Sequence, residues 1–224
     1  MNDNLIPNNI MKKNILYAAA AAILALAGMA VEGCTPTHNG PECVLMGDSI
    51  TEQWLKYRPE FFENNGFVGA GISGQVTGQI LARFDEDVVA RDPEAVSILC
   101  GINDIAQNQG YISNEDIAKN IAVMIDKAKA AKIRVILWSV LPSDVLCWRR
   151  EIDPAPLVKG LNIRLKALAE EKGVTYIDFY NSHVTETGGL PADLTTDGVH
   201  ESSMRPGKEI PSEKGICKLH HRTR

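Results

Sequence analysis

The sequence lacks the features that several protein classes require. Its five cysteines are few and scattered, which argues against a disulfide scaffold, and no Cys-x-x-Cys pair suggests a zinc or redox site. It has no basic excess either: 23 Lys and Arg against 28 Asp and Glu give a net charge of −5, whereas nucleic-acid binding usually needs a basic face. We find no internal repeat, no linker to a second domain, and no His, Asp and Glu cluster with the spacing of metal ligands. What remains is a soluble protein with a single core, either an enzyme or a binding domain.

The N-terminal segment has the pattern of an export signal. Lys12 and Lys13 precede an apolar run over Ile15–Ala27, and small residues follow it. A transmembrane helix is the alternative, but the run is shorter than the roughly 20 residues that span a bilayer. We therefore expect residues 1–33 to be a signal peptide with an upstream extension, and the mature protein to be periplasmic, attached to the cell envelope or secreted.

Cys34 ends the segment Val31-Glu32-Gly33-Cys34, which resembles a bacterial lipobox. Lipidation of Cys34 would attach the protein to a membrane, whereas cleavage after Ala30 would release it in soluble form. Export leads to an oxidising compartment, but the sequence does not determine whether any of the other cysteines pair: Cys43, Cys100, Cys147 and Cys217.

Short apolar runs alternate with helical patterns along the rest of the chain. The runs cover Val44–Met46, Gly66–Val68, Ala95–Cys100, Ile133–Val140 and Val174–Asp178. They are continuous rather than alternating, which is typical of parallel strands that are buried on both faces. The sequence therefore predicts a five-stranded parallel sheet between two layers of helices, a three-layer α/β/α fold.

Two of the helices between these strands carry clear signals. Ser113 to Asp116 has the form of a capping box, and apolar residues then follow at helical spacing: Ile117, Ile121, Met124, Ile125 and Ala128. The same spacing recurs at Leu157, Leu161, Leu165 and Leu168, with Gly173 where a helix C-cap belongs.

Four groups of polar residues and glycines follow the predicted strands or lie in late loops. They are Gly47-Asp48-Ser49, Ile72-Ser73-Gly74-Gln75, Gly101-Ile102-Asn103-Asp104 and Asp197-Gly198-Val199-His200. Loops at the carboxyl ends of parallel strands meet at one edge of the sheet. Together the groups contain a nucleophile, a base, an acid and oxyanion donors, which is what acyl transfer from an ester needs.

The residue types suggest a role for each group. Ser49 is the candidate nucleophile, His200 the general base, and Asp197 the acid that orients the His200 ring. The backbone N–H groups of Ser49 and Gly74 and the side-chain amide of Asn103 are candidate oxyanion donors. Taken alone, each group has an ordinary structural interpretation as a helix cap or a turn, and His200 could be an exposed loop histidine without a catalytic role.

All four groups together, in this order, resemble the blocks of the SGNH (GDSL-type) hydrolase superfamily. The resemblance runs from about Val44 to His200. The segment Gly71-Ile72-Ser73-Gly74-Gln75 resembles the glycine block in one branch of the superfamily, that of platelet-activating-factor acetylhydrolase-like and sugar O-acetylesterase enzymes. It implies a flavodoxin-like sheet and a serine esterase that works through an acyl-serine intermediate without cofactor or metal. The expected substrate is a small-molecule or carbohydrate ester with a short acyl group, acetyl first, on a sugar or lipid.

Two aromatic residues have two open interpretations. Trp54, and Trp148 with its neighbours Arg149 and Arg150, could stack on a sugar ring or hold an acidic head group. Core packing or a surface patch would explain these residues equally well.

One rival motif is present. Gly69 to Gly74 also fits G-x-G-x-x-G, the dinucleotide fingerprint of an oxidoreductase. That motif belongs after the first strand and needs an acidic residue at the end of the next one, but this run follows the second strand, and the next strand ends in Gly101. The oxidoreductase is therefore the remote alternative.

The segment after His200 departs from the superfamily. Residues 201–224 hold six Lys or Arg against three Glu and show no apolar helical spacing, so we expect a hydrolase domain over residues 34–200 and an anomalous basic tail over 201–224. This tail is either natural or the product of a changed reading frame, and the usual final helix is expected to be missing. The alternative function is then an inactive or weakened hydrolase that serves as a binding module.

Overall fold

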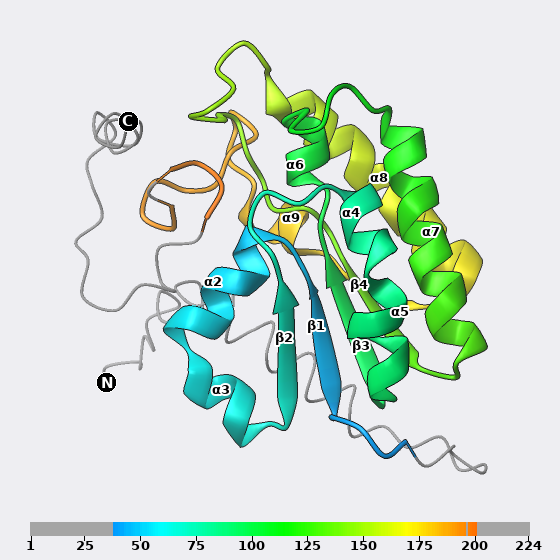
Figure 1. The fold of residues 1–224 in the computed structure, drawn as a ribbon. Helices are drawn as coiled ribbons and strands as arrows, with labels where there is room; N and C mark the ends of the chain where they lie inside the picture. The colour runs from blue at the N-terminus through cyan, green and yellow to red at the C-terminus, as the bar shows by residue number, and fades with distance from the viewer. Residues whose placement is uncertain (1–37, 196, 201–224) are drawn as a thin grey trace, which may run out of the picture.

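The computed structural model describes residues 38–195 and 197–200. Five parallel strands form one sheet in the order β2-β1-β3-β4-β5 (Figure 1). The strands are β1 (Cys43–Gly47), β2 (Phe67–Gly71), β3 (Ala95–Leu99), β4 (Arg134–Trp138) and β5 (Thr175–Ile177). The predicted five-stranded parallel sheet is confirmed. Its second strand is longer than expected, because the glycine run pairs with β1: Met46 lies opposite Ala70, and Gly47 lies opposite Gly71.

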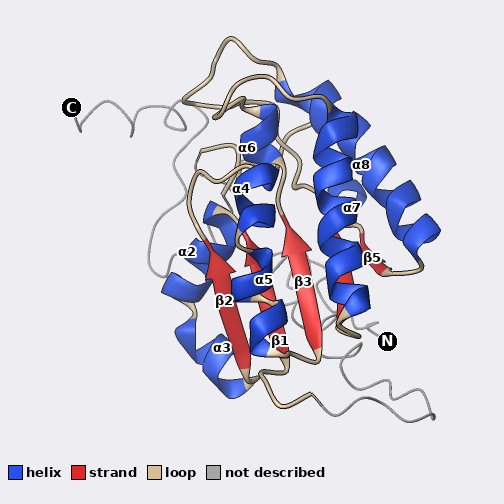
Figure 2. Cartoon of the chain, turned by 45° about the vertical axis from the view of Figure 1, so that its right-hand side comes forward, coloured by secondary structure: helices blue, strands red, loops and turns tan. Residues whose placement is uncertain are grey.

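Helices cover both faces of the sheet, as Figure 2 shows. One face carries α2 (Ser49–Tyr57), α3 (Pro59–Asn64) and α9 (Phe179–His183). Aromatic rings join this layer to the sheet: Trp54 of α2 packs edge-on against Trp138 of β4, and Trp138 stacks on Phe179 of α9. The other layer consists of α4 (Thr77–Ala82), α5 (Phe84–Asp87), α7 (Asn114–Ala130) and α8 (Pro154–Lys172), with α7 packed between α4 and α8. The three-layer α/β/α architecture is therefore confirmed.

The two helices with clear sequence signals form as expected. Ser113 caps α7, its side chain accepting from the backbone N–H of Asp116 at 3.1 Å, and the five predicted apolar residues of α7 are buried. Helix α8 ends at Gly173 in the left-handed conformation with φ +63°. Leu157 differs from its predicted partners, because it lies in the first turn of α8 and is 39% exposed, whereas Leu161 and Leu165 are buried.

The strand order reverses at β1, which has β2 on one side and β3 on the other. In doubly wound sheets the segments that leave the two strands at such a point diverge and open a crevice at their carboxyl ends. Ser49 follows β1 directly, and the short helix α6 (Ile102–Ile105) follows β3. The topology therefore places two of the four predicted groups side by side at the carboxyl edge of the sheet.

Several expectations fall on residues outside the described ranges. These are the signal peptide over 1–33, lipidation at Cys34, and the tail over 201–224 with its missing helix, so the domain boundaries stay predictions. Within residues 38–195 and 197–200, Cys43, Cys100 and Cys147 form no disulfide. No helix in this part of the chain has the length and apolar character to cross a membrane.

Candidate active site

Ser49 lies at the junction of β1 and α2. Gly47 ends the strand, and a Cβ there would lie 2.5 Å from the carbonyl oxygen of Leu99, so only glycine allows this close approach. Asp48 caps the helix, its Oδ1 accepting from the backbone N–H of Ile50 at 3.0 Å. Ser49 is then the first residue of α2, where a backbone N–H has no partner within the helix. Its hydroxyl and its N–H are both presented at the carboxyl edge of the sheet.

His200 and Asp197 complete a hydrogen-bonded chain with Ser49. His200 Nε2 lies 2.8 Å from Ser49 Oγ, across 151 residues of sequence, and His200 Nδ1 lies 2.7 Å from Asp197 Oδ2. The other carboxylate oxygen of Asp197 accepts from the backbone N–H groups of His200 and Val199 at 2.7 and 3.0 Å. The structure thus brings the three predicted catalytic residues together in the order Asp197, His200, Ser49.

The loop that carries Asp197 and His200 is anchored by local contacts. Gly198 has φ +84°, and a Cβ there would lie 2.5 Å from Val145 Cγ1, so a side chain would strain the backbone and collide. Thr195 Oγ1 accepts from the backbone N–H of Gly198 at 2.9 Å and donates to the carbonyl oxygen of His200 at 2.9 Å. Val199 is buried in the core. These contacts hold the His200 ring toward Ser49.

Asp197 is a carboxylate at neutral pH. Burial would raise its pKa, but the side-chain hydrogen bond from His200, the His200 charge and the two backbone N–H groups lower the pKa to about 2. An anion at Oδ2 requires a proton on the facing Nδ1 of His200, which leaves Nε2 free to accept from the Ser49 hydroxyl. The donors and acceptors along this chain are therefore arranged as a serine nucleophile needs.

The two other predicted oxyanion donors lie after the neighbouring strands, Gly74 in the turn after β2 and Asn103 in α6 after β3. Gly74 has φ +78°, and a Cβ there would meet nothing within 4 Å, so glycine is needed for its backbone conformation rather than for space. Asn103 of α6 is buried and donates through Nδ2 to the carbonyl oxygen of Gln75 at 3.0 Å. An amide nitrogen carries two hydrogens, so one remains for an oxyanion.

Two polar links, from α4 to α6 and from the C-cap of α4 to the end of β1, escaped the sequence analysis. Arg83 donates to the carbonyl oxygen of Gly47 at 3.0 Å and to Gln75 Oε1 at 2.7 Å, which fixes the end of β1 to the loop of Gly74. Asp104 accepts from the backbone N–H and the hydroxyl of Thr77 at 2.9 and 2.6 Å. Asp104 belongs to a predicted block, but the sequence carries no signal for its partner or for Arg83, because both links depend on how α4 packs.

Buried acids lie beneath the site. Burial raises the pKa of Asp48 to about 6, and its Oδ2 is buried with no hydrogen-bond partner among the described residues. Burial also raises the pKa of Asp104, although the Thr77 hydrogen bonds oppose it, and it raises the pKa of the Cys100 thiol. In the described part of the chain, no three His, Cys, Asp or Glu side chains are grouped so that they could hold a metal ion.

The two tryptophans that the sequence singled out differ in their surroundings. Trp54 is 4% exposed and lies in the core, stacked on Phe61, so it is not available to a sugar. Trp148 is 38% exposed, and its Nε1 donates to Asn108 Oδ1 at 3.1 Å. Only Trp148 remains a candidate for contact with a substrate.

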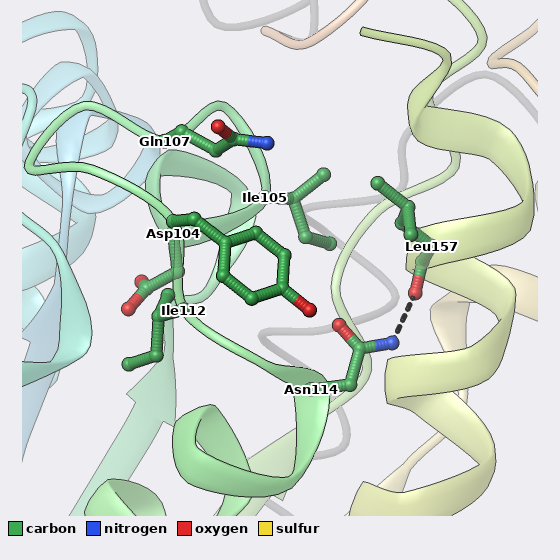
Figure 3. Close-up of a pocket in the computed structure, with 7 residues that line it drawn as sticks. Asp104, Ile105, Gln107, Ile112, Asn114 and Leu157 are labelled. Atoms are coloured by element: carbon green, nitrogen blue, oxygen red, sulfur yellow. Dashed lines mark hydrogen bonds between the residues drawn. The ribbon is translucent and has the colours of Figure 1, made fainter.

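A small pocket of about 230 Å³ lies beside α6 (Figure 3). Asn114 bridges two of its walls by donating to the carbonyl oxygen of Leu157 at 2.9 Å. None of the predicted site residues lines it; its lining residues are Asp104, Ile105, Gln107, Tyr111, Ile112, Asn114 and Leu157.

With this geometry established, the chain can be compared with known proteins. Residues 45–203 match the family model of the GDSL-like lipase/acylhydrolase family. The chain belongs to this family.

An acetylxylan esterase from Geobacillus stearothermophilus is 50% identical over 73% of this chain and 88% of that protein. The crystal structure of a GDSL-like lipase from Bacteroides thetaiotaomicron VPI-5482 has a TM-score of 0.72 and 38% identity, covering 84% of this chain and 91% of that one. An uncharacterised lipoprotein, YqeF, from Bacillus subtilis (strain 168) is 27% identical over 54% of this chain and 56% of its own length.

Membership of the GDSL-like family confirms the resemblance drawn from the four blocks and makes the chain an ester hydrolase. The glycine run has a packing explanation that does not involve a dinucleotide. A Cβ on Gly71 would lie 2.3 Å from the backbone nitrogen of Glu52, and one on Gly69 would lie 2.9 Å from the Leu55 side chain. These glycines let α2, the helix that carries Ser49, lie close against β2.

Proposed function

We propose that this esterase removes short acyl groups, acetyl first, from a carbohydrate ester through an acyl-serine intermediate. The observation that carries the proposal is the unbroken chain from Asp197 through His200 to Ser49, with separations of 2.7 and 2.8 Å. The 50% identity to an acetylxylan esterase supports an acetylated sugar as the substrate class.

The reaction has two halves. Ser49 Oγ attacks the ester carbonyl carbon while His200 Nε2 takes its proton, and the resulting oxyanion accepts from the N–H groups of Ser49 and Gly74 and from the Asn103 amide. The bond to the sugar oxygen then breaks, that oxygen takes the proton from His200, and the acetyl group stays on Ser49. In the second half water gives a proton to His200 and attacks the acyl-serine, releasing acetic acid and restoring the Ser49 hydroxyl.

The geometry favours an active enzyme over the weakened hydrolase that serves as a binding module. That alternative requires a poorly positioned base, and a misplacement of about 1 Å costs about 100-fold in rate. His200 instead lies within hydrogen-bonding distance of both its partners. The anchoring of its loop by Thr195 and Val199 uses only residues that precede the tail.

The test compares the purified full chain with its Ser49→Ala variant. Acetate release from acetylated xylo-oligosaccharides and from p-nitrophenyl acetate should fall by about 10⁴-fold or more in the variant. Rapid quenching of the wild type during turnover should give an acetyl mass increment on the peptide that contains Ser49. Equal rates for both proteins would overturn the proposal, whereas an active wild type that never carries the increment would overturn the acyl-serine step alone.

We also propose that the protein is exported and held at the membrane through a lipidated Cys34. The charged and apolar segments before Cys34 support this, as does the similarity to a lipoprotein from Bacillus subtilis. Metabolic labelling with a radioactive fatty acid should mark the wild type but not a Cys34→Ala variant. Equal labelling of the two would refute the assignment.

A further inference from the structure

Asn108, which the reaction described above does not use, is the centre of a hydrogen-bond cluster. Its Nδ2 donates to Asn103 Oδ1 at 3.0 Å and to the carbonyl oxygen of Gly74 at 3.3 Å. Its Oδ1 accepts from the indole N–H of Trp148 at 3.1 Å. Asn108 is half-buried, and it joins both neighbouring donors of the oxyanion hole to an exposed tryptophan.

These contacts determine which way the Asn103 amide points. The oxygen and nitrogen of an amide have nearly the same size, and if they were exchanged Asn103 would present a lone pair to the oxyanion instead of a hydrogen. Gln75 offers Asn103 a carbonyl oxygen, which can only accept. Asn108 offers it an amide nitrogen, which can only donate. Both neighbours therefore favour the orientation in which Nδ2 is available to the substrate.

The orientation of Asn108 is determined in the same way. The indole nitrogen of Trp148 can only donate, so it selects Oδ1 of Asn108, and the carbonyl oxygen of Gly74 can only accept, so it selects Nδ2. The Trp148 indole and the two backbone carbonyls therefore select the same direction for both amides that lead to the oxyanion hole.

The backbone reinforces this arrangement. Helix α6 ends in a Schellman motif: the N–H of Gln107 donates to the carbonyl oxygen of Asp104 at 2.9 Å, and the N–H of Asn108 donates to that of Asn103 at 3.1 Å. Gln107 has φ +54°, the left-handed conformation that this motif requires. Asn108 and Asn103 are therefore joined through the main chain and through their side chains.

We infer that Asn108 is a positioning residue, which holds the Asn103 amide in its oxyanion-donating orientation, with its own direction set by the indole N–H of Trp148. The inference rests on the proposed function, because it assigns a role to a neighbour of the oxyanion hole. It predicts that changes at Asn108 lower kcat and leave KM nearly unchanged, since Asn108 acts on the transition state through Asn103.

The principal variant is Asn108→Asp. A carboxylate has nearly the same shape and still accepts from Trp148, but it cannot donate to Asn103 Oδ1 or to Gly74. The kcat for p-nitrophenyl acetate should fall about 10- to 100-fold, with KM within about 2-fold of the wild type. Trp148→Phe keeps an aromatic ring and removes the N–H. It should also lower kcat, but by less than Asn108→Asp does. Asn65→Asp is the matched control, because Asn65, the C-cap of α3, is half-buried and donates to the carbonyl oxygen of Phe61. The kcat of this control variant should not change.

A double-mutant cycle separates positioning from a general loss of structure. In the Asn103→Ala background, Asn108→Asp should cost at most about 2-fold more, because the amide it orients is already gone. Multiplicative losses, a kcat within about 2-fold of the wild type, or a change confined to KM would each overturn the inference. The Ser49→Ala protein, measured in parallel, keeps the two proposals distinguishable: its inactivity together with a fully active Asn108→Asp protein would refute the positioning role alone.

Discussion

Replacing Asp48 with Asn should stabilise the protein at neutral pH. Asp48 is fully buried, and only Oδ1 has a partner among the described residues, the backbone N–H of Ile50 that it caps. Asn is an equally good helix cap, so Asp48→Asn keeps this hydrogen bond and the shape of the side chain. It removes the charge that the wild type must bury.

The magnitude follows from the pKa. Burial raises the pKa of Asp48 from its ordinary value of 3.8 to about 6, so the folded protein binds this proton more tightly than the unfolded chain. Each pKa unit corresponds to about 1.4 kcal/mol, so ionised Asp48 costs up to about 3 kcal/mol. The sign is opposite to that of a salt-bridged acid: the full stability is present below about pH 4 and is lost as the pH rises through about 6. Since Asn cannot ionise, the variant should not show this loss.

Unfolding by urea, followed by circular dichroism at pH 4 and pH 7.5, tests this expectation. The two proteins should unfold alike at pH 4, and Asp48→Asn should be about 2–3 kcal/mol more stable at pH 7.5, roughly 4–10 °C in Tm. Asp153→Asn is the matched control, because Asp153 caps α8 but is exposed; its effect should be small and equal at both pH values. The reasoning is refuted if the Asp48→Asn difference is the same at both pH values, or if the variant is the less stable protein at pH 7.5.

Three further predictions concern the site and its surroundings. Asp197→Asn should lower kcat by about 10⁴-fold. Because the pKa of Asp197 is lowered to about 2, the wild type should also lose about 2 kcal/mol of stability between pH 4 and pH 2. Urea titrations of the Asp197→Asn variant should not show this loss of stability. Asn103→Ala should reduce kcat by about 10²- to 10³-fold with little change in KM, and a KM effect alone in steady-state kinetics would contradict its role. Gln107→Gly should raise the free energy of unfolding by about 0.5–1 kcal/mol, because glycine adopts a φ of +54° without the side-chain penalty. A lower free energy of unfolding for the variant in urea denaturation would count against strain at Gln107.

The sheet and the principal helices were predictable because their signals are local. A buried strand needs a short apolar run, and an amphipathic helix needs apolar residues at its own period, so β3 and α7 can be located without knowledge of their neighbours. The extent of β2 was missed because it depends on contacts with other elements. The glycines of β2 looked like a loop, because their strand conformation is stabilised by pairing with β1 and by the close approach of α2.

The sequence by itself predicted which chemical groups form the site: Ser49, Gly74, Asn103, Asp197 and His200 all lie in the four blocks on which the resemblance to the family rests. Only the tertiary structure decided their geometry. The strand order places the ends of β1 and β3 side by side at the carboxyl edge of the sheet. Packing of the last described loop brings His200 to Ser49 across 151 residues. The roles inferred for Arg83 and Asn108 leave no trace in the sequence, because a hydrogen bond between distant segments depends on where the fold places both partners rather than on any spacing along the chain.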